Sequence, residues 1–135
     1  MGRSTLHVTR LVALAALAAT ALAAAPAAKH VHLSRSEPMA DSTVRAAPAA
    51  IKLWFSAAVQ ISVTSVRVTG PDGAAVETAA PRMGEGPNAP VIADVRGQLK
   101  PGRQQVAWRT MSRDGHPVAG AFAFTFAPAG AAAGR

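Results

Sequence analysis

The sequence predicts an all-β protein, a single immunoglobulin-like Greek-key sandwich of about seven strands. Beyond the N-terminal segment the chain shows no convincing helical periodicity, and short β-type runs alternate with turn residues. The clearest indication is in residues 118–126, where Phe122, Phe124 and Phe126 recur at period two and therefore share one face of a strand. The chain contains no cysteine, so the sandwich must form without the disulfide of antibody domains.

The expected strands are short segments of β-type residues, bounded by Gly, Pro, Asp or Ser. Ile51, Leu53 and Phe55 alternate on one face of their segment, and Val106 and Trp108 do the same in theirs. In order, the expected strands are residues 31–36, 51–55, 59–63, 66–68, 75–78, 91–95, 103–111 and 118–126.

The connections between these strands contain the turn residues. The apolar register slips near Thr64 and Ser65, which predicts a bulge or a crossing from one sheet to the other. Residues 79–90 hold three prolines and two glycines and are expected to be a loop, as are residues 112–117. In a Greek-key sandwich the first strand and the last two can be neighbours, which would bring residue 30 close to the loop at 112–117.

The N-terminus has the composition of a secretory signal. Arg3 and Arg10 give a positive start, residues 11–25 are apolar and uncharged, and small residues at Ala27 and Ala28 suit cleavage. We expect an exported, soluble, periplasmic domain; a retained N-terminal anchor is the alternative. The expected divisions are a signal peptide at 1–28, the sandwich at 29–127 and a disordered tail at 128–135.

Composition disfavours or excludes several classes of function. The formal net charge is +7, but the basic residues are scattered singly, without the basic helix or aromatic-interleaved stripe that indicates nucleic-acid binding. The absence of cysteine excludes thiolate sites, and with them zinc ribbons, iron–sulfur clusters and blue copper. Any metal must therefore be held by nitrogen, oxygen or thioether ligands.

Two motifs far apart in the chain contain three of its four histidines. His30 and His32 follow the expected cleavage site, and Asp114 and His116 lie in the loop at 112–117. Residues two apart in extended backbone point to the same side, so each pair can face one metal ion. A free α-amine, imidazoles and one carboxylate form a nitrogen and oxygen ligand set that suits Cu(II) best among the common divalent ions.

Each of these residues has an ordinary alternative. Asp-Gly begins many turns, a histidine before proline is common in loops, and His32 is read equally well as a surface histidine on an edge strand. Four further residues are expected to serve in packing rather than at the site: Met39, Met111, Trp54 and Trp108.

Four stretches, found in order, carry a resemblance to a known family. They read HVHLSRSEP at 30–38, APAAIKLWFS at 47–56, LKPG at 99–102 and VAWRTMSRDGHPVAG at 106–120. In these residues the chain resembles the CopC-type periplasmic copper-binding proteins, over nearly the whole expected mature domain. The resemblance implies a β-sandwich in which the mature N-terminal histidine, through its amine and ring, holds Cu(II) together with the Asp and His of the last motif. Those roles would fall to His30, Asp114 and His116.

Two departures from the family pattern bear on the metal chemistry. Many members have a methionine-rich loop for Cu(I), whereas residues 79–90 keep only Met83, too little for a soft thioether site. Lys29 precedes His30, so the mature chain is expected to begin at Ala28 or Lys29. If Ala28 is first, an amine, two deprotonated amides and the His30 imidazole can form a square-planar chelate instead of a histidine brace. If Lys29 is first, its amine can still reach the metal.

The function expected from these observations is a copper-binding protein of copper homeostasis or resistance. It would be a monomeric carrier or sequestering protein, with Cu(II) as its ligand and an inner-membrane copper transport protein as a possible partner. One alternative is a histidine-brace copper oxidative enzyme, disfavoured by the absence of tyrosine as an axial group. The other is a metal-free structural sandwich, which would keep the two motifs apart.

Overall fold

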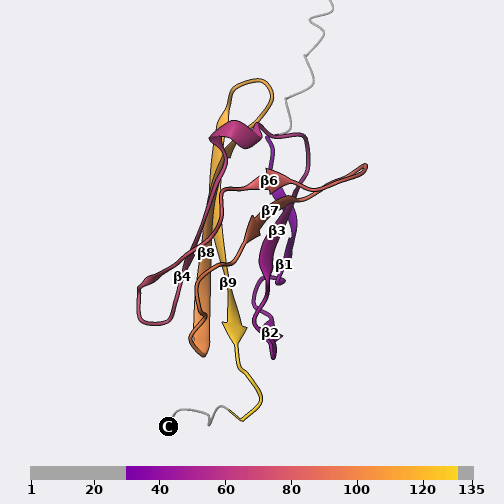
Figure 1. Ribbon diagram of the computed structural model, residues 1–135. Helices are drawn as coiled ribbons and strands as arrows, with labels where there is room; N and C mark the ends of the chain where they lie inside the picture. Colours follow the sequence, from indigo (N-terminus) through magenta and orange to yellow (C-terminus); the bar gives the residue numbers. More distant parts are fainter. Residues whose placement is uncertain (1–29, 131–135) are drawn as a thin grey trace, which may run out of the picture.

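The computed structural model describes residues 30–130, which form the predicted all-β sandwich (Figure 1). Two sheets pack face to face, and the described chain begins at the same end of the sandwich as the connection between β8 (Gly102–Met111) and β9 (Pro117–Phe126), opposite the end at which β9 finishes. The expected signal peptide and the last five residues of the expected tail lie outside the described residues. No helix within residues 30–130 has the length and apolar character needed to span a membrane.

One sheet has four strands and contains the first strand of the domain. β1 pairs with β3, β3 pairs with β7, and β7 pairs with β6, all antiparallel. The register of β1 against β3 shifts between Leu33 and Arg35, which marks a bulge in β1. In spatial order the strands are β1 (Leu33–Glu37), β3 (Ala50–Phe55), β7 (Val91–Asp94) and β6 (Arg82–Met83).

The other sheet has five strands and is built around one long hairpin. β8 and β9 pair along their whole length, from Gly102 opposite Phe126 to Met111 opposite Pro117. β2 adds to β9 in parallel, while β4 and β5 extend the sheet beyond β8 in antiparallel pairs. In spatial order the strands are β2 (Thr43–Val44), β9 (Pro117–Phe126), β8 (Gly102–Met111), β4 (Ser65–Thr69) and β5 (Ala75–Val76).

The core lies between the sheets and is filled by alternating residues from both. Phe124 and Phe126 are buried, and Phe122 packs against them at the margin, as their spacing predicts. The Trp108 ring is also buried and meets Phe55 of the facing sheet edge-on, with 5.1 Å between ring centroids. The largest fully buried aliphatic side chains are Ile51, Leu53, Val68, Val91 and Val106.

The predicted strand at residues 59–63 is wrong. Val59 makes an isolated bridge to Ser112, and Ile61–Val63 form one turn of 3-10 helix, η1, which leaves Val63 half exposed. The predicted crossing between sheets is confirmed, because β3 belongs to the four-stranded sheet and β4 to the five-stranded one. The apolar register therefore slips because a helical turn interrupts the alternation.

Three other expectations require correction. Met39 is 65% exposed and is not a packing residue. Trp54 points to the outer face of its sheet, opposite Ile51 and Leu53, where it is half buried beneath the Arg35 guanidinium, 4.3 Å from the ring centroid. The expected loop at 79–90 contains the short strand β6, which pairs with β7.

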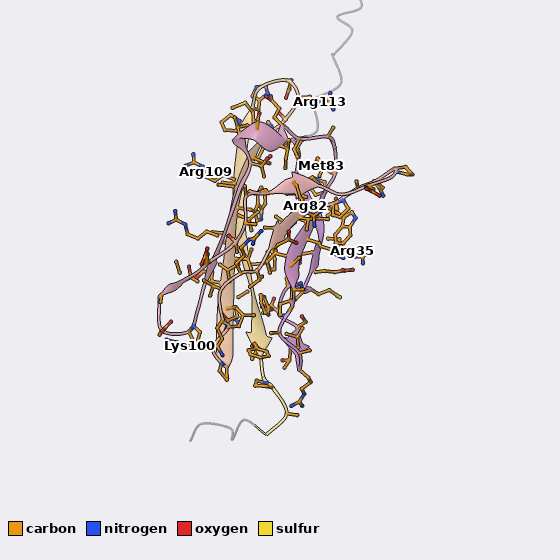
Figure 2. All side chains as sticks on the ribbon, in the orientation of Figure 1. Arg35, Arg82, Met83, Lys100, Arg109 and Arg113 are labelled. Atoms are coloured by element: carbon orange, nitrogen blue, oxygen red, sulfur yellow. The ribbon has the colours of Figure 1, made fainter. Side chains whose placement is uncertain are left out.

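The outer faces of the two sheets differ in how their charges are arranged. On the four-stranded sheet Arg35 pairs with Glu37 and Arg82 pairs with Asp94. Figure 2 shows Arg109 extending on the opposite side of the molecule, from the five-stranded sheet. Among the described residues Arg109 has no carboxylate within 4.0 Å. Within the described part of the chain, the outer face of the four-stranded sheet thus carries paired charges, whereas that of the five-stranded sheet carries the unpaired Arg109.

Candidate metal centre

The β8–β9 hairpin positions two of the candidate ligands. Pairing of the hairpin ends with Met111 opposite Pro117, and the five residues between them form the loop that carries Asp114 and His116. Gly115 separates the two and has φ of +88°, a conformation that glycine adopts without steric cost. Asp114 and Gly115 thus make a turn, as expected of an Asp-Gly pair. The turn also brings the side chains of Asp114 and His116 together.

Asp114 and His116 contact each other directly at the tip of this loop. Nδ1 of His116 lies 2.9 Å from Oδ2 of Asp114. An ionised carboxylate can only accept, so Nδ1–H is the donor. The other oxygen, Oδ1, accepts from the Ser112 hydroxyl. The hydrogen bond from Ser112 and, next, that from His116 lower the pKa of the Asp114 carboxyl below its ordinary value, which keeps it ionised at neutral pH.

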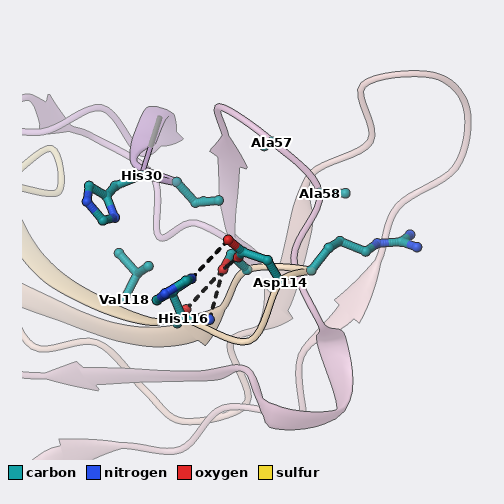
Figure 3. A pocket seen from close by; sticks show the side chains of 9 residues that line it. His30, Ala57, Ala58, Asp114, His116 and Val118 are labelled. Carbon is teal, nitrogen blue, oxygen red and sulfur yellow. Dashed lines mark hydrogen bonds and ion pairs between the residues drawn. The ribbon is translucent and has the colours of Figure 1, made fainter. Parts of the chain in front are cut away.

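His30, from the other end of the chain, lies close to Asp114 and His116. Val31 is buried in the core and fixes the backbone at this point, while the His30 side chain is exposed. Figure 3 shows its ring beside that of His116, with 6.4 Å between the ring centroids and the planes nearly perpendicular. The expected neighbourhood of the first strand and the last hairpin is thus present in the fold.

The three residues line one cavity of about 320 Å³ at the end of the sandwich. The rest of its lining consists of the small or aliphatic residues Val31, Ala57, Ala58 and Val118, together with Ser112 and Arg113. The Asp114 and His116 side chains are more than half exposed, so an ion could reach them from solvent without any opening of the fold. The arrangement offers nitrogen and oxygen donors in an accessible, partly apolar pocket, which suits binding and release of a small cation.

His32 does not line this cavity. Its side chain is exposed, and its backbone N–H donates to Ser56 Oγ at 3.0 Å while its carbonyl accepts from the Ser56 N–H at 2.9 Å. Across residues 30–130, no three His, Asp or Glu side chains are arranged to hold a metal without further movement. The α-amine expected at the mature terminus belongs to residues outside those described.

Sequence reasoning missed Ser112 and the wall formed by Ala57 and Ala58. Ser112 is buried beneath Asp114 and His116 and bonds to both. Its place two residues before Asp114 in the loop is a signal that could have been used, since Ser side chains commonly bond to nearby backbone in turns. The two alanines carry no such signal and reach the site because the β3–η1 connection passes over it.

The chain resembles known proteins in both sequence and structure. Residues 33–127 match the family model of the CopC domain, a span that includes Asp114 and His116. Among relatives, protein YobA of Escherichia coli K12 is 34% identical over 96 residues, covering 71% of this chain and 77% of that protein. Copper resistance protein C of Escherichia coli is 37% identical over 103 residues, covering 71% and 80%.

A solved structure agrees with these matches. CopC from Methylosinus trichosporium OB3b superposes with a TM-score of 0.65 at 29% identity, covering 74% of this chain and 96% of that one. The family model alone spans well over half of the sequence, and the two-sheet architecture is shared. The chain therefore belongs to the CopC family.

Proposed function

We propose that this protein binds one Cu(II) ion per chain through His30, Asp114 and His116 and serves as an exported carrier or sequestering protein in copper homeostasis. The observation that carries the proposal is the meeting of these three side chains, from both ends of the sequence, in one cavity. Membership of the CopC family, with a relative named for copper resistance, supports copper as the ion.

The chemistry of the donor set supports Cu(II) over other ions. Two imidazoles and a carboxylate are borderline to hard donors, and Cu(II) leads the first-row divalent ions in affinity for such sites. Completion of a tetragonal site requires the His30 ring to approach His116 and requires nitrogen from the backbone terminus. The terminal nitrogen enters either as the Lys29 amine, in a brace with the His30 ring, or as part of an amine–amide–imidazole chelate that begins at Ala28.

The number and placement of the methionines favour Cu(II) over Cu(I) as the bound ion. Met83 is 45% exposed and lines a neighbouring cavity that shares Ala57 and Ala58 with the metal pocket, but it is a single thioether. Met39 is exposed on another part of the surface, beside β1. A soft site needs several sulfur ligands, and one methionine is too few.

A site whose ligands are exposed suits transfer of the ion rather than chemistry on it. The oxidative-enzyme alternative would need an axial group and a surface that presents a substrate, and the sequence has no tyrosine. We therefore propose a non-enzymatic role, with the domain soluble in the periplasm after removal of residues 1–28 and an inner-membrane copper transport protein as a partner. Such a role requires release as well as binding, which partial exposure of Asp114 and His116 permits.

Titration of the purified mature protein with Cu(II) tests the proposal. We expect one ion per chain and an electron spin resonance spectrum of tetragonal, nitrogen-rich copper. Intact mass identifies the first residue and so distinguishes the brace from the chelate. A stoichiometry near zero, or a sulfur-rich or tetrahedral spectrum, would overturn the proposed site. Sustained ascorbate-driven peroxide chemistry by the loaded protein would favour the enzyme instead.

A further inference from the structure

Ser112 is buried directly beneath two exposed candidate ligands. Its residue exposure is 6%, whereas the side chains of Asp114 and His116 are 55% and 64% exposed. It follows the last residue of β8 and makes an isolated bridge to Val59 of the β3–η1 connection. The residue therefore belongs to the rigid body of the sandwich, while its neighbours in the loop face solvent.

The backbone of Ser112 closes the loop. Its N–H donates to the His116 carbonyl at 3.0 Å, and its carbonyl accepts from the Gly115 N–H at 3.0 Å and from Gln60 Nε2 at 2.8 Å. The His116 N–H in turn donates to Ser112 Oγ at 3.0 Å. These bonds hold the backbone of His116 in place before any ion is present.

The Ser112 hydroxyl then orients the carboxylate. Oγ lies beside both Asp114 Oδ1 and, at 3.2 Å, the His116 carbonyl. A hydroxyl has one proton to donate, and an ionised carboxylate is the stronger acceptor, so the proton goes to Asp114. With Oδ1 held there, Oδ2 faces Nδ1 of His116 at 2.9 Å and orients the imidazole in the metal-free protein; Oδ2 exchanges this hydrogen bond for the ion when both side chains bind it.

We propose that Ser112 is the positioning residue of the copper site: it presets the Asp114 carboxylate and, through it, the His116 ring. This inference rests on the proposed function. Groups that orient metal ligands by hydrogen bonding commonly contribute 10- to 100-fold to metal affinity, because a ligand held in place loses less freedom on binding. The chain thereby compensates for the exposure of both ligands by anchoring them to a buried hydroxyl.

The direct test is the Cu(II) affinity of Ser112→Ala. We expect the Kd to rise about 10- to 100-fold, with Ser112→Thr, which keeps the hydroxyl, recovering most of the loss. Ser36→Ala is the matched control, because Ser36 is buried to the same degree (5% exposed) and its hydroxyl donates to the Pro38 carbonyl at 2.9 Å in the other sheet. Its Kd should equal that of the wild type.

A second measurement separates orientation from general loss of structure. In the metal-free protein, nitrogen NMR of the His116 ring should show a single tautomer in the wild type and in Ser112→Thr, and averaging of both tautomers in Ser112→Ala. Unchanged affinity and an unchanged ring signal in folded Ser112→Ala would overturn the proposal, as would Ser112→Thr behaving like Ser112→Ala. Wild-type protein that binds no Cu(II) refutes the proposed function, whereas the ring signal alone still decides whether Ser112 orients His116.

Discussion

The backbone of Gly120 touches the indole ring of Trp108 on the paired strand. A Cβ at position 120 would lie 2.5 Å from Cζ2 and 2.9 Å from Cε2 of that ring, closer than nonbonded carbon atoms approach. The two residues are register partners in the β8–β9 hairpin. The absence of a side chain at Gly120 is therefore what allows Trp108 to lie down over β9 and reach Phe55.

Gly120→Ala should destabilise the protein by about 1–3 kcal/mol, the usual cost of forcing extra atoms into a packed core. The measurement is chemical denaturation of the metal-free protein. Trp108→Phe removes the ring atoms that would clash, so Gly120→Ala should cost much less in that background. Equal costs in both backgrounds would show that the cost of Gly120→Ala does not come from contact with the Trp108 ring.

His116→Ala should weaken Cu(II) binding more than Asp114→Ala, and His32→Ala should weaken it least. His116 supplies an imidazole nitrogen, Asp114 supplies a weaker oxygen donor, and His32 lies away from the cavity lining. Isothermal titration of the three variants gives the order. Equal losses would contradict the assignment of the site.

Added Cu(II) should raise the melting temperature at pH 7.5 but not at pH 4.5. Imidazoles must be neutral to bind a metal, and their reference pKa is about 6.5, so protons displace the ion on acidification. At a free concentration 100-fold above Kd the ion adds about 2.7 kcal/mol to stability at the higher pH. Scanning calorimetry with and without copper checks this, and a large shift that persisted at pH 4.5 would exclude a histidine site.

Lys100→Met should raise the pKa of the Asp72 carboxyl toward its ordinary value. In the native protein the hydrogen bond from Lys100 is the main reason that this pKa is lowered, and the Ala74 N–H contributes a second bond at 3.2 Å. Because the Ala74 bond survives the substitution, the pKa should remain somewhat depressed. Carbon-detected NMR titration of the carboxyl measures both effects.

The pairing of Lys100 with Asp72 also makes stability depend on pH, in a direction that can be predicted. A carboxyl whose pKa is lowered on folding stabilises the native state above its unfolded pKa, and this contribution is lost as pH falls through the folded value. Lys100→Met should therefore lower stability slightly at neutral pH and not at all in strong acid. A constant difference at all pH values would mean that the lysine acts through packing alone.

The sequence predicts best those strands in which apolar and polar residues alternate over many positions. Ten-residue strands such as β8 and β9 repeat the pattern often enough to identify both the strand and its buried face. Val59, Ile61 and Val63 also alternate, yet they form a bridge and a 3-10 turn, because three residues do not distinguish a strand from an irregular crossing. Two-residue strands such as β6 have no periodicity at all.

Trp54 and Met39 show a second limit. A large apolar residue is expected in the core, but the pleat places Trp54 outward, and the cation of Arg35 covers its ring instead.

At the candidate metal centre, Asp114 and His116 are predictable because their proximity is local to one turn. The approach of His30 depends on how the two sheets pack, and the burial of Ser112 beneath the loop depends on the β3–η1 connection.

The position of His30 opposite His116 has a topological consequence. An ion held by both would join points more than 80 residues apart in a chain that contains no cysteine. Such an ion binds only the folded chain, so it stabilises the fold by mass action and, in contrast to a covalent cross-link, leaves the unfolded chain unrestricted. Unlike a disulfide, the connection between His30 and His116 is removed by a chelator or by transfer of the ion to a partner. The loaded protein is therefore expected to resist proteolysis better than the empty one, because proteolysis follows the population of opened chains.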